Sequence, residues 1–171
     1  MLKRIRSPHS PSPSASSAKG GLIRVGVVAS EYNRKHVDSL LDGALGVLRD
    51  AGAEVDVVRV PGAFEIPLVA EILAGGGQCQ AVLCLGVIIR GETAHADLVG
   101  ESVTGALMEI GLRHRIPVIH EVLLVADTAQ ADVRCLQPEH NRGVEAAGTA
   151  LSMIRIVGRM KRSGMKRASD T

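Results

Sequence analysis

The sequence predicts an α/β fold in which a four-stranded parallel sheet carries helices on both faces. Two observations support this fold class. Apolar runs of strand length alternate four times with longer segments that show the 3.6-residue periodicity of amphipathic helices. Hydrophobic residues make up 46% of the chain but aromatic residues only 1%, so Val, Leu, Ile and Ala must build the core, as they often do around parallel strands. Such alternation implies right-handed crossovers between the strands.

Each expected strand is an apolar run bounded by turn residues. The strands are expected over residues 22–29, 54–60, 81–89 and 117–125. The first run is almost continuously β-branched, as in a strand that is buried on both faces, and the second alternates until Pro61 closes it. These four segments are therefore expected to form the sheet.

The segments between the strands predict helices. The first helix follows Asn33, carries an apolar stripe and ends at Gly52. The second opens at residues 63–67, because Pro67 is tolerated only in a first turn, and it runs out at the glycines 75–77. The remaining helices are expected over residues 95–115, over residues 129–133, and from residues 141–143 through Ile154.

The chain is expected to form one domain over residues 21–158, flanked by two tails. Residues 1–20 contain a Ser- and Pro-rich stretch that cannot bury apolar surface, which predicts a disordered tail, and residues 159–171 form a basic C-terminal tail. The basic residues gather at the two ends of the chain, so residues 21–154 carry 10 basic and 17 acidic residues, a net charge of −7. This distribution favours solubilising ends over a nucleic-acid-binding fold.

Composition also argues against several kinds of partner. Single-stranded nucleic acid is bound on aromatic platforms, and the chain has only Tyr32 and Phe64. No apolar run approaches the roughly 18 residues of a membrane span. Cys79, Cys84 and Cys135 are odd in number and lack the close spacing of metal ligands, which favours a reduced, cytoplasmic protein. We therefore expect neither a nucleic acid nor a membrane as a partner.

Unusual residues follow every expected strand. Tyr32 follows the first strand, residues 62–65 the second, residues 90–95 the third and Asp127-Thr128 the fourth. Parallel strands end at one edge of a sheet, and ligands of such sheets bind beyond that edge. The sequence therefore predicts one site to which all four segments contribute.

The segment after the third strand has the features of an anion and proton site. Gly91 breaks the strand, and a helix restarts near His95. A helix N-terminus presents free N–H groups that suit a phosphate, and Arg90 or Arg134 would add a cation. His95 is a candidate general acid/base, although a histidine at a helix start is more often a capping or surface residue.

Two neighbouring residues each admit two roles. Phe64 is either part of the core or the floor of a pocket for a flat heterocycle. Glu65 either complements a helix dipole or accepts hydrogen bonds from ligand hydroxyls, and these roles are compatible. The spacing of the histidines is not that of metal ligands, and neither dinucleotide-binding nor P-loop glycine spacing is present, so no metal or nucleotide site of those kinds is expected.

Four segments carry a resemblance to a known family. They cover residues 60–67, 86–97, 127–134 and 141–147, and the second reads Gly-Val-Ile-Ile-Arg-Gly-Glu-Thr-Ala-His-Ala-Asp. In content, order and spacing, nearly the whole of residues 22–157 resembles 6,7-dimethyl-8-ribityllumazine synthases. The resemblance implies a flavodoxin-like three-layer α/β/α sandwich. It also implies homopentamers with active sites between neighbouring subunits, either free or within a 60-subunit shell.

The resemblance further implies a transferase of riboflavin biosynthesis. Its two small-molecule substrates are 5-amino-6-(D-ribitylamino)uracil and 3,4-dihydroxy-2-butanone 4-phosphate, and it needs no metal or organic cofactor. By position, His95 would move protons, and Glu92, Thr93 and Arg134 would bind the phosphate. The residues that would bind the pyrimidine substrate are Tyr32, Ala63, Phe64, Glu65, Val87, Ile88, Ile89 and His120.

The chain departs from the family pattern in its fourth strand. His120-Glu121 stands where the family usually has Phe-Gly, and an imidazole stacks more weakly on a pyrimidine than a phenyl ring does. The loop 135–140 lacks the small, Gly-rich sequence typical of icosahedral members, which favours a free pentamer. An alternative hypothesis is a non-catalytic assembly protein of the same fold that binds flavin or lumazine. A third is a nucleic-acid-binding role for the basic tails.

Overall fold

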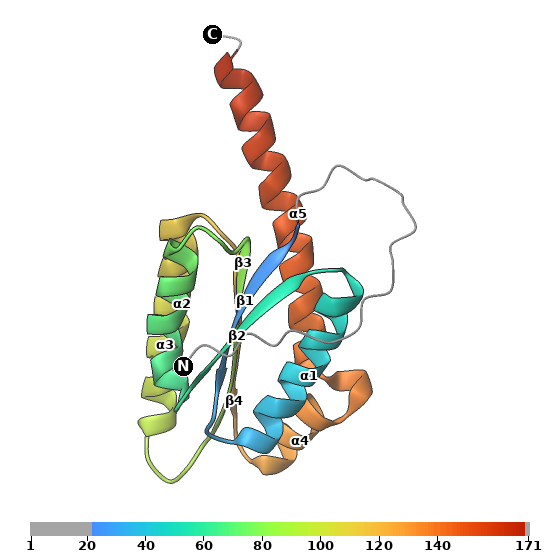
Figure 1. Cartoon of the computed structure of the whole chain (residues 1–171). Coiled ribbons are helices and arrows are strands. Elements are labelled where there is room, and N and C mark those ends of the chain that lie inside the picture. The colour runs from blue at the N-terminus through green and yellow to red at the C-terminus, as the bar shows by residue number, and fades with distance from the viewer. Residues whose placement is uncertain (1–21, 170–171) are drawn as a thin grey trace.

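A four-stranded parallel sheet with strand order β2-β1-β3-β4 forms the centre of the molecule (Figure 1). The structure is a computed structural model and describes residues 22–169. The predicted N-terminal tail, residues 1–20, lies outside this range. The elements are β1 (Arg24–Ser30), α1 (Arg34–Asp50), β2 (Glu54–Val60), the 3-10 turn η1 (Ala63–Glu65), α2 (Ile66–Gly75), β3 (Ala81–Ile89), α3 (His95–His114), β4 (Val118–Val125), α4 (Thr128–Leu136), the 3-10 turn η2 (Pro138–His140) and α5 (Arg142–Ser169).

The helices form two layers, one on each face of the sheet. Helices α2 and α3 cover one face, and α1, α4 and α5 cover the other (Figure 1). This arrangement confirms the predicted fold class. Among the described helices, none is both long enough and apolar enough to cross a membrane.

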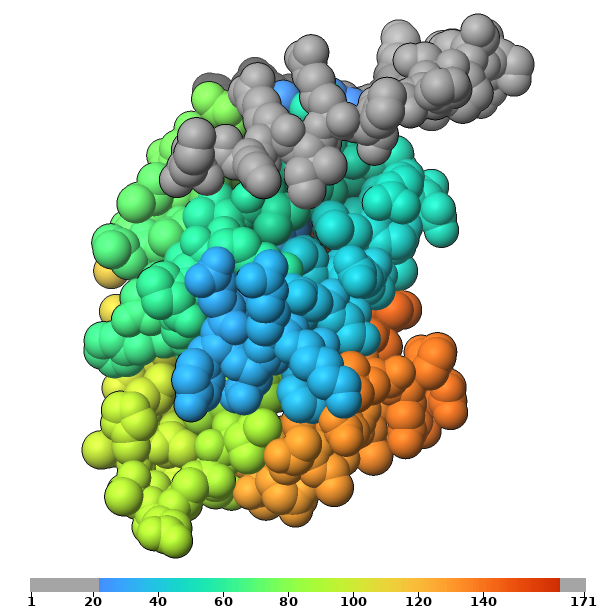
Figure 2. Space-filling view, turned by 60° about the horizontal axis from the view of Figure 1, so that its bottom comes forward, coloured from blue at the N-terminus to red at the C-terminus, as the bar shows by residue number. Residues whose placement is uncertain are grey.

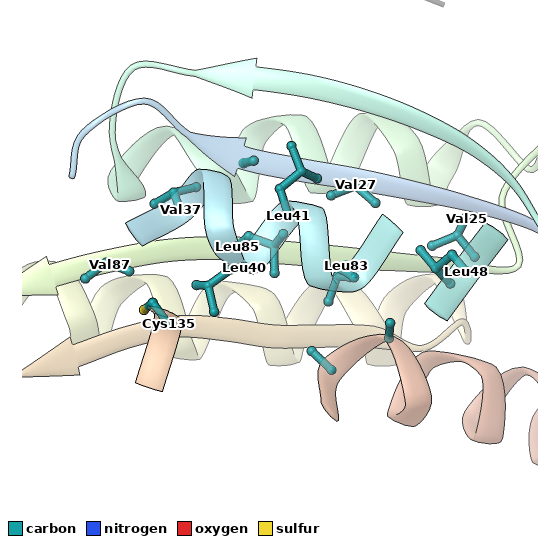
Figure 3. Close-up of a cluster of buried hydrophobic side chains, with 14 of the residues drawn as sticks. Val25, Val27, Val37, Leu40, Leu41, Leu48, Leu83, Leu85, Val87 and Cys135 are labelled. Atoms are coloured by element: carbon teal, nitrogen blue, oxygen red, sulfur yellow. The ribbon is translucent and has the colours of Figure 1, made fainter. Parts of the chain in front are cut away.

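Each face of the sheet has its own aliphatic core because successive strand side chains point to opposite faces. Val25 and Val27 of β1 and Leu83 of β3 point toward α1, where they meet Leu40 and Leu48 (Figure 3). The intervening strand residues join a second cluster with α2 and α3, whose largest fully buried members are Ile66 and Leu107, Val28 and Val82. Burial on both faces explains why the central strands read as continuous apolar runs.

Helix α4 is longer than the sequence predicted, and it starts at a capping residue. Asp127 occupies the N-cap position, and its carboxylate Oδ1 accepts a hydrogen bond from the N–H of Gln130 at 2.8 Å. An N-cap aspartate satisfies a first-turn donor that otherwise has no partner. The helix therefore begins directly after Asp127 and continues to Leu136.

Helix α5 is also longer than expected. It continues to Ser169, through most of the segment that the sequence assigned to a basic tail, and its last turns extend away from the two layers (Figure 1). The helix meets no proline after Arg142, and single glycines such as Gly158 only weaken a helix. The domain boundary at residue 158 stays a prediction.

The start of α5 packs very closely against α1. A Cβ atom on Gly143 would lie 1.9 Å from the backbone oxygen of Leu40, so only glycine fits this contact. The buried side chain of Asn141 holds the same junction: its Nδ2 donates to the carbonyl of Cys135 at 2.7 Å and to that of Ser39 at 3.1 Å. The packing of α1 and α5 thus depends on backbone contact as well as on apolar side chains.

We predict that Gly143→Ala lowers the free energy of unfolding by about 3 kcal/mol or more, because α5 must move away from α1 to admit the methyl group. Gly148→Ala in the same helix is the matched control, since its added Cβ would meet nothing within 4 Å. The control is expected to gain up to about 1 kcal/mol from helix propensity. Urea unfolding at one protein concentration measures both variants, and equal midpoints would contradict the close-packing argument.

Candidate active site at the carboxyl edge of the sheet

A cavity of about 750 Å³ lies at the carboxyl edge of the sheet. Its volume falls in the range of about 300–1,000 Å³ that is usual for small-molecule sites. Figure 2 looks onto this end of the molecule. The segment after β1 (blue) lies there between the segment after β2 (green) and helix α4 (orange). The predicted residues that line the cavity are Tyr32, Ala63, Phe64, Glu65, Val87, Ile88, Ile89, Thr93 and His95. The fold therefore brings together most of the predicted site.

Both aromatic residues of the chain stand at this cavity and are exposed. Phe64 is 62% exposed and Tyr32 is 73% exposed. Of the two roles that the sequence left open for Phe64, the exposed side chain excludes the role in the core. Exposed apolar groups that gather at one place on the surface mark contact with a ligand or a partner. Their position at the cavity suits them to cover a flat ring.

Backbone contacts place the loop that carries Tyr32. The N–H of Tyr32 donates to the carbonyl of Pro61 at 3.0 Å, which joins the loop to the end of β2. The next residue, Asn33, adopts the left-handed conformation with φ 54°, and its Nδ2 donates to the carbonyl of Val87 at 2.8 Å. Asparagine tolerates this conformation better than most residues. The loop after β1 is therefore bonded to both neighbouring strands.

The cavity has an apolar floor and a polar rim. Val87 is buried, and Ile88 and Ile89 are half-buried at the end of β3. The carboxylate of Glu65, the hydroxyl of Thr93 and the imidazole of His95 line the same cavity. An apolar surface with a few polar groups is the usual composition of a site that binds and orients a small molecule.

The start of α3 offers backbone donors beside this cavity. Ala94 occupies the N-cap position and has no side-chain acceptor for the first turn. The N–H of His95 lies 3.5 Å from Oγ1 of Thr93, which is a long contact for a hydrogen bond. Residues 90–95 are exposed, so an anion can approach these donors from solvent. Glu92 belongs to this loop but does not line the cavity.

Two predicted residues lie away from the cavity. Arg134 lines a second cavity of about 630 Å³ between α4 and the start of α5. His120 lines neither cavity: its Nε2 lies 2.9 Å from Oγ1 of Thr104 on α3. The Thr104 hydroxyl donates its only proton to the carbonyl of Gly100 at 2.7 Å, so the imidazole donates to the hydroxyl. Partial desolvation lowers the pKa of the His120 imidazole and favours the neutral ring, although the residue as a whole is exposed.

Sequence reasoning missed Ala96 of the first cavity and three further lining residues, namely Leu98, Val99 and Ser102. The last three follow His95 by three, four and seven positions, so they share its face of α3. Projecting this helical spacing forward from His95 would have identified them.

Arg142, which lines the second cavity, forms a partly buried ion pair that sequence reasoning also missed. Nε of Arg142, the first residue of α5, donates to Oε1 of Glu121 at 3.1 Å, and the same guanidinium contacts Glu145. The Glu121 side chain is only 6% exposed. Burial raises the pKa of its carboxyl, and the contact with Arg142 only partly opposes this effect. Arg142 and Arg134 line the same cavity.

The fold and the site define the class of protein first. The chain is a flavodoxin-like α/β protein with a small-molecule-sized cavity where β1 and β3 end, at the switch point of the sheet. Comparison with known proteins then gives the family. Residues 22–157 match the sequence profile of 6,7-dimethyl-8-ribityllumazine synthase, and the chain belongs to this family.

Individual relatives agree with this assignment. A 6,7-dimethyl-8-ribityllumazine synthase of Thermococcus kodakarensis is 42% identical over 144 residues, which cover 84% of this chain and 92% of the relative. A protein of the same name from Xanthobacter autotrophicus is 44% identical and covers 81% and 87% of the two chains. A third, from Methylobacterium radiotolerans, is 38% identical over 156 residues, with coverage of 91% and 94%.

We predict that the buried carboxyl of Glu121 makes stability depend on pH. Its pKa is raised in the folded state, so its contribution to stability is complete below the unfolded pKa and is lost as pH rises through the folded pKa. Glu121→Gln removes this titration. The free energy of unfolding of the variant minus that of the wild type should therefore be larger at pH 7 than at pH 4.

Urea unfolding at the two pH values measures this difference. Glu145→Gln is the matched control, because it removes an exposed carboxylate from the same arginine and should change stability by less than about 1 kcal/mol. A difference for Glu121→Gln that stays constant between pH 4 and pH 7, or falls, would contradict the prediction.

Proposed function

We propose that the protein condenses 5-amino-6-(D-ribitylamino)uracil with 3,4-dihydroxy-2-butanone 4-phosphate in the cytoplasm, and releases 6,7-dimethyl-8-ribityllumazine, phosphate and water. This is the penultimate step of riboflavin biosynthesis. The observation that carries the proposal is the match to the family over residues 22–157, in a fold whose cavity gathers most of the residues that the motifs predict.

The pyrimidine substrate is proposed to bind across the apolar floor. Val87, Ile88 and Ile89 lie under the flat ring, and Phe64 and Tyr32 are exposed beside it. The carboxylate of Glu65 accepts hydrogen bonds from the ribityl hydroxyls. An aromatic surface with one directed acceptor fixes both the plane of the ring and the direction of its polyol chain.

The phosphate of the second substrate is proposed to bind at the start of α3. The backbone N–H groups around Glu92 and the hydroxyl of Thr93 supply donors, and the helix dipole favours an anion there. This placement sets the ketone next to the pyrimidine amine. Holding two substrates together in this way supplies a large part of the rate enhancement in a bimolecular reaction.

His95 is proposed to move the protons. The pyrimidine amine attacks the ketone, an imine forms with loss of water, phosphate leaves, and the resulting enol becomes a ketone. The ribitylamino nitrogen then attacks this ketone and closes the ring with loss of a second water. Each step transfers a proton, and histidine is the side chain suited to both give and accept one near neutral pH. His95 stands at the cavity rim beside Thr93, close to the proposed leaving group.

The protein is proposed to act as a homopentamer with shared active sites. Arg134 and His120 do not reach the main cavity of their own chain, so they would serve the cavity of a neighbouring subunit. The outer surface of α2 and α3 also exposes large apolar side chains that a neighbour would cover, namely Leu68, Ile72, Leu98, Met108 and Leu112. Exposed apolar patches of this kind mark protein interfaces.

The direct test is to mix the purified protein with both substrates and follow the lumazine chromophore. We expect a rate well above the uncatalysed condensation, and a decrease in kcat of about 100-fold for His95→Gln, the lower end of what general acid/base catalysis contributes, with little change in KM. His114→Gln, at the other end of α3, is the control and should retain activity. Tight riboflavin binding without turnover by the wild type would instead support the non-catalytic alternative.

The shared active site predicts that two variants of low activity rescue one another. His95→Ala and Arg134→Ala subunits, unfolded together and refolded as an equal mixture, should form mixed pentamers. Each site takes His95 from one subunit and Arg134 from its neighbour, and each of these residues is intact in one half of the subunits. About one quarter of the sites in a mixed pentamer therefore have both residues and recover activity. Each variant refolded alone is the control. A mixture no more active than either variant alone would contradict the sharing of residues between subunits.

A further inference from the structure

An ion pair closes the loop that carries the proposed phosphate-binding residues. Arg90 follows β3, and Asp97 lies in the first turn of α3. Both Nε and Nη2 of Arg90 donate to Oδ1 of Asp97, at 3.0 and 2.6 Å. The backbone N–H of Arg90 also donates to the carbonyl of Val125 at 2.9 Å, so this residue is attached to the end of β4. The pair therefore connects the sheet to the start of the helix.

The loop between these two residues has little intrinsic stiffness. A Cβ on Gly91 would meet nothing within 4 Å, and residues 91–95 are exposed. Ala94 cannot cap the helix with a side chain, and the contact of Thr93 Oγ1 with the His95 N–H is long, at 3.5 Å. Glycine adds conformational freedom that packing does not remove here. The Arg90–Asp97 contact is thus the strongest polar constraint that the structure shows across this loop.

We propose that Arg90 and Asp97 are positioning residues whose ion pair holds Thr93 and His95 at the cavity rim and thereby determines the affinity for the phosphorylated substrate. This inference rests on the proposed function, because it takes the loop to bind the phosphate. Neither residue lines the cavity, and two donors of Arg90 are already used by Asp97. Arg90 accordingly acts through the loop and makes no contact with the phosphate.

The chain contains a matched ion pair far from the site. Arg24 at the start of β1 donates to Oε2 of Glu54 through Nε at 3.2 Å and Nη2 at 2.7 Å. Both pairs join an arginine fork to a single carboxylate oxygen and are partly exposed. Arg24 and Glu54 stand at the amino ends of their strands, opposite the cavity. Glu54→Gln therefore reproduces the chemistry of Asp97→Asn without touching the loop.

The test compares Asp97→Asn with Glu54→Gln in steady-state kinetics of the lumazine reaction. Asp97→Asn should raise KM for the butanone phosphate and the inhibition constant of inorganic phosphate by about fivefold, the order that a partly exposed ion pair can contribute. KM for the pyrimidine substrate should change less than about twofold, since Asp97 does not touch its part of the cavity. Glu54→Gln should leave all three constants unchanged.

Arg90→Gln and the double variant show whether the two residues act through one another. A positioning pair predicts that the double variant resembles each single variant, because breaking the contact once releases the loop. A direct phosphate ligand predicts the opposite: Asp97→Asn would free Arg90 and lower KM for the butanone phosphate, whereas Arg90→Gln would raise it. That result would overturn the proposal.

The outcomes separate this proposal from the proposed function. A wild-type protein that makes no lumazine overturns the function and, with it, the positioning role that rests on it. An active wild type in which Asp97→Asn behaves like Glu54→Gln overturns the positioning role alone. Equal increases in both KM values in Asp97→Asn also overturn it, since they would indicate a general loss of structure.

Discussion

The pairing of β1 with β3 is the interaction on which the candidate site depends. These strands are neighbours in the sheet although β2 lies between them in the chain, so the helices that follow them pack on opposite faces. Because these two helices leave the sheet toward opposite faces, a crevice opens between them at the carboxyl edge. The side chain of Asn33 joins the two strand ends by its bond to the carbonyl of Val87, so Tyr32, the end of β3 and His95 line one cavity.

The shortage of aromatic residues has a consequence for the surface as well as for the core. Two layers of Val, Leu, Ile and Ala fill both sides of the sheet, and helices that carry small side chains approach as closely as Gly143 and Leu40 do. The only phenylalanine and the only tyrosine of the chain are left at the cavity, largely exposed. Together with the exposed apolar residues of α2 and α3, they give the physical reason to propose that each subunit needs a neighbour.

Much of the architecture was predictable because it is encoded locally. Each strand was recognisable from its apolar run, and the start of α2 from Pro67, because these patterns depend on near neighbours in the chain. Element ends were less predictable: α4 extends to Leu136, and α5 passes residue 158 without a stop signal. Phe64 could not be assigned to the core or the site, because periodicity does not say whether a helix start is covered by other elements.

The sequence by itself determined the parallel α/β order, the four strand ends at which chemistry gathers, and the motifs that identify the family over residues 22–157. Tertiary structure alone decided that Arg134 faces a different cavity from His95, and that Arg90 is held by Asp97. The physical reason is that these outcomes depend on which way a side chain points after distant segments have packed. Spacing along the chain specifies the elements, but the packing of the two layers against the sheet sets the direction of each side chain at its edge.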